Sequence, residues 1–537
     1  MNIKIKRKKG FIVGIVLVLL FVSFPMKRII GQNNNTNKRS GHVLEKTEEI
    51  DQVLNYSIST GNKDSTLIGQ RVLQNGGNAI DAAIAISFGL GVVAPQNGGL
   101  GGGGVVLVYD PIQNKSFYYD YYNSTGHETS NYQIGIPGFL RGMEAIYTDY
   151  ASMPIEMLLS DSISLAREGI TVSEDLGNII ERRSFITEFN KNFINNGKII
   201  TANDILIQED LAQSYEQVVK SGFGIIYDGE SEMSQNLMRE TGLTAQSLQD
   251  YSVRKYEALA MDLGGRKVYG AGTPFSSITS MQMLSMYDKT NFNWNEFESD
   301  ESLLVYNELY SIASTENYIH VGDNETYRSN LYKHANSKYV DKMLSEKNIE
   351  SSTDINESQN TTSFTVIDDQ GFVVVGTHTL SNYWGSGRSH DGFFYNNSLK
   401  HFSNSTPNVY GTMKRPKTFM SPLIIKDDEE TIAIGAAGGY AIPQVVPTII
   451  SMYLDSGIPL ETAVDTQRFG KYNKVYMIER SKLRGNKLFE HEPTIVSTEY
   501  VDIDQKVGFI SLSSVKNNNY NAYYETTWCD ASCAVYK

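Results

Sequence analysis

The stretch NTTSFTVIDDQGFVVVGTHT places two threonines where a polar segment gives way to strand-like sequence. The preceding residues, 345–360, carry few apolar side chains and are typical of a surface loop. A threonine hydroxyl is a weak nucleophile, but a cut before Thr361 would free an α-amine with a pKa near ~8 that can accept the hydroxyl proton. The alternative is a hydroxyl-rich turn that leads into a buried hairpin, which β-propensity alone explains.

Two further features would complete a site for acyl transfer. Thr379 lies on the next predicted strand, in a hairpin whose turn is near residues 369–371, and could orient the Thr361 hydroxyl. A tetrahedral intermediate also needs donors for its oxyanion, and the N–H groups of a Gly-Gly turn can approach closely because no Cβ intervenes. The segment GAAGGYAIP supplies such a turn at Gly438 and Gly439.

The elements that must position these residues follow from hydrophobic periodicity. Apolar residues between Leu67 and Val93 recur at helical spacing around an NGGN turn and predict two helices. VVLVYD and KSFYYDYY predict a hairpin, whereas residues 138–345 are mostly helical, with a strand and turn at LGGRKVYGAGTP. Four strand candidates then precede a helical end: TSFTVIDD, GFVVVGTHTL, SPLIIKDD and TIAIGAAGG. Helices on both sides of a strand-rich centre favour a layered α/β sandwich.

A glycine-rich run, NGGLGGGGVVLVYD, contains a formal G-x-G-x-x-G. A dinucleotide-binding fingerprint follows a strand and opens a helix, whereas this run follows a predicted helix and leads into a strand. The run therefore indicates close approach to another backbone segment or to a ligand.

Bulk properties bound the cellular setting. The chain has 537 residues and a net charge of −14, so its global charge does not support nucleic-acid binding. A cluster of Lys and Arg precedes an apolar run from Phe11 to about Met26, which is typical of a secretion signal. Residues 1–28 are expected to be a signal anchor or a cleaved signal peptide, and residues 29–50 a polar tether. We expect the protein on the extracellular face of the membrane, or secreted if the signal is cleaved.

The chain has two cysteines, Cys529 and Cys533, which could form a small disulfide loop or remain free thiols. Its sequence has no His-rich or His/Cys metal-binding spacing. No metal or other cofactor is expected.

Three motifs, in order between about residues 55 and 470, resemble the γ-glutamyltranspeptidase family of N-terminal-nucleophile hydrolases. They are NGGNAIDAAIAISFGLGVVAPQNGGLGGGG, NTTSFTVIDDQG and GAAGGYAIPQ. The resemblance implies autocatalytic cleavage between Asn360 and Thr361, with residues 51–360 as large and 361–537 as small subunit of one four-layer αββα sandwich. It also implies that Thr361 attacks a γ-glutamyl carbonyl with help from Thr379, and that Gly438 and Gly439 form the oxyanion hole.

Within that family, THTLSNYWGSGRSHDGFFYNN and KRPKTFMSP are most similar to members that cut capsular poly-γ-glutamate and transfer it to the cell envelope. Ser381 stands where glutathione-type members usually have asparagine. His401 stands where those members have an acidic residue that holds the free α-amine of a terminal glutamyl group. Loss of that carboxylate suits an enzyme that acts inside a polymer.

The resemblance and the local charge together predict a substrate pocket. An anionic polymer needs a basic patch, and Arg415 and Lys417 lie in the best cluster, with Arg388 in the adjoining loop. Other positions depart from the family pattern: Tyr122 replaces an arginine that holds the substrate carboxylate, and Ser363 replaces a histidine. The residues expected to bind substrate are Ser381, Asn397, Arg415, Lys417 and Thr418.

The leading functional expectation is a self-processing γ-glutamyl acyltransferase or hydrolase that cleaves capsular poly-γ-glutamate and transfers it to a cell-wall amine or to water. One alternative is a glutathione-type γ-glutamyltransferase. A second is a non-catalytic scaffold that retains the fold, an interpretation supported by the loss of the arginine at Tyr122.

Overall fold

The computed structural model describes most of the chain after residue 54. The described ranges are 55–182, 193–195, 197–294, 300–347, 361–466, 468–472, 475–479, 499–503, 508–524 and 532–536. The predicted signal and tether, and most of the polar segment before Thr361, lie outside these ranges. Within them, no helix combines the length and the apolar character that a membrane span requires.

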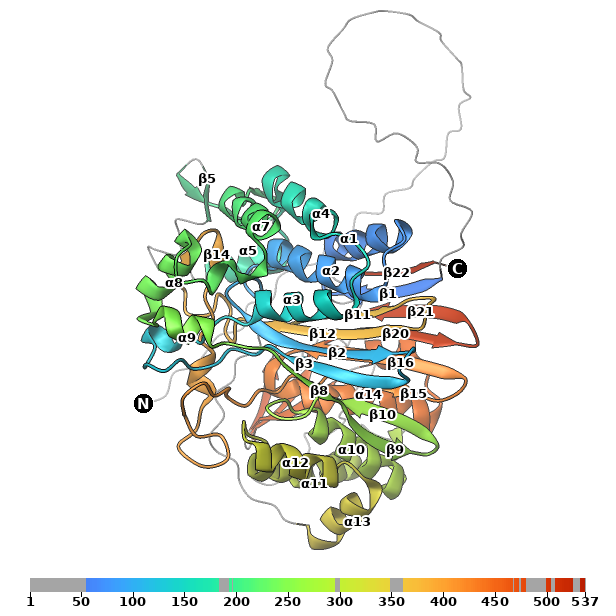
Figure 1. Ribbon diagram of the computed structural model, residues 1–537. Helices are drawn as coiled ribbons and strands as arrows, with labels where there is room; N and C mark the ends of the chain where they lie inside the picture. The colour runs from blue at the N-terminus through green and yellow to red at the C-terminus, as the bar shows by residue number, and fades with distance from the viewer. Residues whose placement is uncertain are drawn as a thin grey trace, which may run out of the picture. The chain divides into compact units, whose positions relative to one another are not determined.

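A seven-stranded antiparallel sheet contains the strand that follows Thr361 (Figure 1). Its strands, in spatial order, are β22 (Ser532–Tyr536), β1 (Tyr56–Thr60), β11 (Thr362–Ile367), β12 (Val373–Thr379), β2 (Gly103–Asp110), β3 (Lys115–Asp120) and β8 (Arg254–Glu257). The centre of the sheet therefore combines strands from both sides of Thr361 in the sequence.

A second antiparallel sheet of six strands packs against the first. Its order is β21 (Asn519–Tyr524), β20 (Phe509–Lys516), β16 (Glu430–Ala437), β15 (Leu423–Lys426), β10 (Arg266–Gly270) and β9 (Leu259–Leu263). Hydrogen bonds of hydroxyl groups connect the two sheets. Ser511 Oγ donates to the Ser363 carbonyl at 3.0 Å, and the hydroxyls of Thr365 and Ser513 lie 2.9 Å apart.

Helices cover the outer face of each sheet, as Figure 1 shows. The first sheet is covered by α1 (Lys63–Gln74), α2 (Ala79–Val93) and α3 (Phe139–Tyr150), while α4 (Ile155–Glu168) and α7 (Glu209–Ser221) pack on α2 and on each other. On the second sheet lie α10 (Ser277–Thr290), α11 (Asp300–His320), α12 (Glu325–His334), α13 (Ser337–Glu346), α14 (Ile442–Ser456) and α15 (Leu460–Asp465). The predicted αββα sandwich is confirmed.

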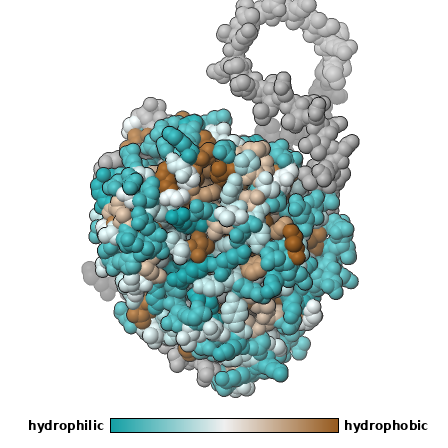
Figure 2. All heavy atoms as spheres, viewed as in Figure 1, coloured by the Kyte–Doolittle hydropathy of each residue, from teal (hydrophilic) through white to brown (hydrophobic). Residues whose placement is uncertain are grey.

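Strand periodicity separates the core into layers. Val106 and Val108 belong to the core between the first sheet and its helices, whereas Val105 and Leu107 belong to the core between the sheets. Successive side chains of a strand point to opposite faces, so both faces of β2 are apolar because both are covered. Figure 2 shows the complementary surface, which is mostly hydrophilic with small, separated hydrophobic patches on the face in view.

The predicted break between the first two helices has a clear local cause. Asn78 Oδ1 accepts hydrogen bonds from the backbone N–H groups of Ile80 and Asp81, and Asp81 Oδ2 accepts one from Asn78 N. This capping box satisfies N–H groups at the start of α2 and fixes where the helix begins.

Residues 138–345 are mostly helical, as predicted, but the prediction omits four two-residue strands, β4 (Ile170–Thr171), β5 (Ile194–Asn195), β6 (Lys198–Ile199) and β7 (Ile205–Leu206), and a longer pair before Arg266. Residues 254–263 form β8 and β9 before the strand at Arg266–Gly270 that the sequence does predict. β9 alternates buried and exposed residues, but at five residues it is too short to stand out from the surrounding helical pattern. Its partner β10 and the sheet it extends supply the remaining stabilisation.

Candidate active site

Thr361 immediately precedes β11 and is 6% exposed. The odd-numbered residues of this strand face the second sheet, because Ser363 and Thr365 contact Ser511 and Ser513 of β20. Continued alternation directs the Thr361 side chain to the same space between the sheets. The predicted nucleophile is therefore at the end of a buried strand and points inward.

Thr379 is the last residue of β12, the antiparallel neighbour of β11. Thr362 pairs with His378, so the next pair in this register is Thr361 with Thr379. Directly opposite residues of an antiparallel pair have their Cα atoms about 4.5–5.5 Å apart and their side chains on one face. The register thus supports the predicted pairing of the two hydroxyls, and the turn that creates it is closed by the bond from Gly371 N to the Asp368 carbonyl at 3.2 Å.

The Gly-Gly turn lies at the same level of the neighbouring sheet. A Cβ added to Gly435 of β16 would come within 3.3 Å of Ser363 Cβ, so these two residues face each other. Two residues along β11 from Ser363 lies Thr361, and two residues along β16 from Gly435 lies Ala437, the last residue of that strand. Gly438 and Gly439 follow directly. Strand register therefore places the turn near Thr361.

The turn itself requires glycine. Gly438 has a φ of +133°, and a Cβ there would lie 2.6 Å from Gly508 Cα. Gly439 has a φ of +57° and begins the short 3-10 turn Gly439–Ala441 that leads into α14. Backbone N–H groups at the start of a helix lack partners within the helix, which suits a role as oxyanion donors. That role stays a prediction.

The glycine-rich run before β2 permits close backbone contact with this site. A Cβ on Gly101 would lie 2.0 Å from the Phe394 carbonyl oxygen, and one on Gly104 would lie 2.1 Å from the Thr377 carbonyl oxygen. Gly103 pairs with Thr379 in the sheet. The prediction of close approach to another backbone segment is confirmed.

Ser381 and Asn397 meet at the end of β12. Ser381 has a φ of +79° and is 1% exposed; its N–H donates to Thr379 Oγ1 at 2.8 Å and its Oγ donates to Ser398 Oγ at 2.9 Å. Asn397 Oδ1 accepts from Asn382 N at 3.2 Å. Both predicted substrate-binding residues therefore build the corner that holds Thr379.

Asn123 is a member of this corner that the sequence did not indicate. Its Nδ2 donates to Ser398 Oγ at 2.5 Å, which extends the hydrogen-bond chain from Thr379 through Ser381 to the segment after β3. Asn123 directly follows Tyr122, the position of the missing arginine, and nothing local in the sequence indicates its partner 275 residues away.

The Arg415 side chain is buried and binds groups of the protein itself. Its guanidinium is 2% exposed and donates to Asp120 Oδ2 at 2.8 Å, to the Tyr122 carbonyl at 3.0 Å and to the Ser252 carbonyl at 2.6 Å. These partners give the side chain a structural role, while the predicted contact with substrate stays a prediction. Arg388 is likewise paired, with Glu240, at 2.7 Å.

Lys417 and Thr418 lie on the segment that leads into the second sheet. The Lys417 ammonium is 5.5 Å from the centre of the Tyr318 ring, and the side chain lines a small pocket with Ser403, Pro407 and Asn408. Thr418 donates its N–H to the Pro274 carbonyl at 3.0 Å. Both residues are buried, and their contact with substrate also stays a prediction.

Two buried histidines flank the site and have different surroundings. His378 lies between the Tyr121 hydroxyl, 3.0 Å from Nδ1, and the Ser87 hydroxyl, 2.8 Å from Nε2. The ring nitrogens of His401 are buried without a hydrogen-bond partner among the described residues. Burial lowers the pKa of each ring to about 3, so both are neutral near pH 7.

Comparison with known proteins identifies the family. The profile described as Gamma-glutamyltranspeptidase matches residues 65–497, which is most of the chain. The chain belongs to the γ-glutamyltranspeptidase family. It is therefore an enzyme, a γ-glutamyl hydrolase or transferase that uses water or an amine as acceptor.

Individual relatives agree with that assignment. The chain is 32% identical over 460 residues to the capsule biosynthesis protein CapD proenzyme of Bacillus anthracis, and the alignment covers 85% of each chain. It is 26% identical over 472 residues to a glutathione hydrolase proenzyme of Escherichia coli, covering 77% of this chain and 80% of the relative. The crystal structure of a cephalosporin acylase from Bacillus halodurans shares the fold, with a TM-score of 0.76, 16% identity and coverage of 93% of this chain and 99% of that chain.

Proposed function

We propose that this chain is an extracellular, self-processing γ-glutamyl acyltransferase that cleaves capsular poly-γ-glutamate and transfers the fragment to a cell-wall amine or to water. The observation that carries the proposal is the position of Thr361: at the buried start of β11, opposite Thr379 in register and level with the Gly438 turn. The basic and apolar N-terminal sequence supports export, with residues 1–28 as anchor or signal.

Processing exposes the group that catalysis needs. The Thr361 hydroxyl attacks the carbonyl of Asn360, the peptide nitrogen becomes the free α-amine of Thr361, and water hydrolyses the resulting ester. In turnover that amine takes the hydroxyl proton as Oγ attacks a γ-glutamyl carbonyl, and then returns the proton to the leaving amine. Water or an acceptor amine finally attacks the acyl-enzyme ester and restores Thr361.

The surroundings of His401 support a polymer over a small γ-glutamyl substrate. By resemblance this position holds a carboxylate that binds a terminal α-ammonium in glutathione-type enzymes. Here a buried, neutral imidazole replaces it, so the position offers no negative charge to an ammonium group. The 32% identity to the capsule proenzyme points the same way.

Denaturing electrophoresis and N-terminal sequencing test the processing step. Wild type should give two fragments, the shorter beginning at Thr361, and Thr361→Ala should remain one chain. Thr362→Ala is the matched control, since even-numbered residues of β11 face the helical layer, as Phe364 does. A single wild-type chain after folding, or an intact Thr362→Ala chain beside a cut Thr361→Ala chain, would contradict the mechanism.

Substrate assays then separate the capsule enzyme from a glutathione-type enzyme, which the 26% identical relative favours. Purified, processed protein is given poly-γ-glutamate and, separately, a chromogenic γ-glutamyl amide. Shortening of the polymer supports the proposal. Turnover of the amide with the polymer left intact would assign the glutathione-type activity instead.

A further inference from the structure

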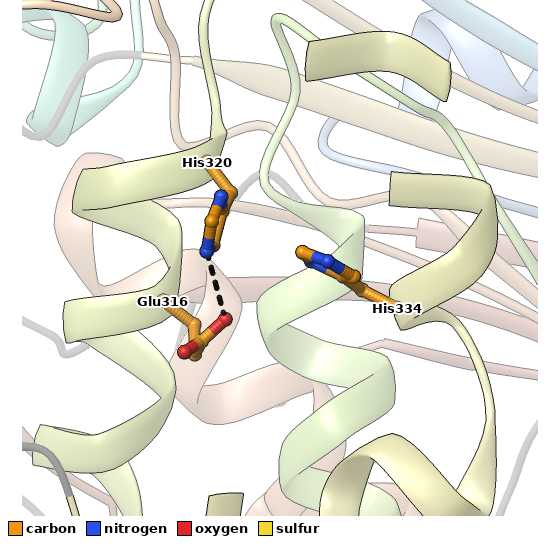
Figure 3. A group of neighbouring side chains, drawn as sticks. All are labelled: Glu316, His320 and His334. Carbon is orange, nitrogen blue, oxygen red and sulfur yellow. Dashed lines mark ion pairs between the residues drawn. The ribbon is translucent and has the colours of Figure 1, made fainter. Parts of the chain in front are cut away.

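Two histidines and a glutamate converge on the outer helices of the second sheet, a feature that the family resemblance does not explain. Glu316 and His320 lie one turn apart in the last part of α11, and His334 ends α12. Figure 3 shows the three side chains pointing toward one another from the two helices. One ligand atom from each lies within 4.8 Å of the others.

We propose that Glu316, His320 and His334 bind one Zn²⁺ ion that fixes α11 against α12. Imidazole nitrogens with one carboxylate oxygen suit zinc better than calcium or magnesium, which prefer oxygen ligands. Three protein ligands leave a fourth tetrahedral position for water.

The distances are close to those that zinc requires. Ligand atoms about 2.1 Å from a tetrahedral ion are roughly 3.4 Å from one another. The separation of His320 Nε2 and Glu316 Oε2 is already 3.5 Å. The three ligand atoms lie within 4.8 Å of one another, so a shift of His334 on the order of 1 Å brings its nitrogen to the separation that a tetrahedral ion requires.

Tyr339 contacts two of the three ligands. The Tyr339 hydroxyl, from α13, donates to Glu316 Oε2 at 2.7 Å. The ring of the same tyrosine stacks on His334, with centres 3.9 Å apart and planes within 8°. Supporting contacts of this kind orient metal ligands, and their loss typically weakens metal binding by 10–100-fold.

Access and charge are compatible with a cation. The His320 and Glu316 side chains are 25% and 14% exposed, so an ion can enter from solvent. Lys333 and Lys342 lie near His334 and repel a cation, but Lys342 is directed over the Tyr339 ring and toward Glu346, 3.9 Å away. Glu316 supplies the opposing negative charge.

The position of the site gives the ion a structural task. The loop between the two helices is docked on the other half of the chain: Gly322 packs on Pro407, and Asp323 accepts a hydrogen bond from Arg415 N at 2.8 Å. An ion that fixes the angle between α11 and α12 therefore also fixes the loop that supports the segment carrying Arg415 and Lys417.

Binding of Zn²⁺ alone to tag-free, full-length protein tests the proposal. Calorimetric titration should give one site per chain with a Kd in the micromolar range or below, and the Tm should rise with zinc concentration. His320→Ala/His334→Ala should lose the site, whereas His127→Ala, which removes an exposed histidine paired with Asp250, should bind as wild type does. Co²⁺ should show visible tetrahedral bands in wild type and not in the double variant.

Two further variants keep the test decisive if the double variant fails to fold. Tyr339→Phe keeps the ring on His334 but removes the hydroxyl that holds Glu316, and should weaken zinc binding by at least tenfold. Glu316→Gln should do the same. Absence of a stoichiometric site in wild type, or zinc binding unchanged in these variants, would overturn the proposal.

Discussion

Ser381 donates its backbone N–H to Thr379 Oγ1 at 2.8 Å from a left-handed conformation with a φ of +79°. This bend directly after β12 lets a backbone donor hold the hydroxyl that lies opposite Thr361. Side-chain bonds from Ser381 and Asn123 to Ser398 Oγ support the bend. The orientation of Thr379 is therefore determined by the backbone and not by a flexible side chain.

Replacing Thr379 by valine should impair both processing and turnover. The change keeps the shape but removes the acceptor of the Ser381 N–H and the neighbour of the Thr361 hydroxyl. We expect kcat on a γ-glutamyl amide to fall about 100-fold or more, whereas Thr379→Ser should retain activity within about tenfold.

Thr377→Val is the matched control for that experiment. Thr377 lies on the same strand and face, is 1% exposed, and its hydroxyl has no hydrogen-bond partner among the described residues. Removing an unpaired buried hydroxyl should leave the Tm unchanged or higher, with normal processing. Equal losses in the two valine variants would contradict a specific role for Thr379.

Gly438→Ala should destabilise the protein more than an ordinary glycine substitution at positive φ. The new Cβ would meet Gly508 Cα, so we expect a loss of about 3 kcal/mol from backbone strain and overpacking together. Gly457→Ala, at the other end of α14, has a φ of +66° and open space within 4 Å, and should cost about 1 kcal/mol. Calorimetry compares the two Tm values, and equal shifts would show that the contact with Gly508 does not matter.

Arg415→Met should separate a structural role from substrate binding. Removing one partner of the buried pair leaves Asp120 uncompensated and should cost about 3–5 kcal/mol of stability. Arg167→Met, which breaks the exposed pair with Glu216, should leave the Tm nearly unchanged.

Kinetics of the folded fraction complete that comparison. If Arg415 acts only through Asp120, KM for polymer should stay at the wild-type value in Arg415→Met. A KM that rises with little change in Tm would instead assign the guanidinium to the substrate, as the sequence predicts.

His378 should make stability dependent on pH. Burial lowers the pKa of its ring to about 3, whereas an unfolded histidine titrates near ~6.5. Between these pH values the unfolded chain binds one more proton than the folded protein. The contribution of His378 to the free energy of unfolding is therefore complete above about pH 6.5 and falls by about 1.4 kcal/mol per pH unit on acidification.

Thermal unfolding from pH 7 to pH 4 checks this effect. On acidification the free energy of unfolding of His378→Gln should fall less steeply than that of wild type. The difference between the two slopes should correspond to the uptake of one proton. Identical slopes for wild type and His378→Gln would contradict the assignment to His378.

The sequence predicted those parts of the site that local pattern determines. The turn at residues 369–371 and the alternation on both sides of it fix the register of Thr361 and Thr379, and the Gly438 turn follows a recognisable strand. The order of predicted helices and strands favours a layered α/β sandwich, and the resemblance to the family implies its four αββα layers. The inferences on the turn and the register need only neighbouring residues.

Contacts between distant segments could not be predicted in the same way. Asp120 and Arg415 are 295 residues apart, so the sequence showed a basic cluster but not the carboxylate that pairs with it. Glu316 and His320 have helical spacing, but His334 joins them only because α12 folds back on α11. The cut site, the pairing of Cys529 and Cys533, and the N-terminal segment stay predictions, since residues 1–54, 348–360 and 525–531 lie outside the described ranges.

The order of strands in the sandwich determines what a nick before Thr361 can release. Among the residues that the structure describes, four ladders would join the two resulting polypeptides: β1–β11, β1–β22, β2–β12 and β10–β15. Separating the fragments would break the hydrogen bonds of both sheets at once and expose their apolar faces to water. Maturation can thus liberate a single amine while the two polypeptides remain interlocked as one body.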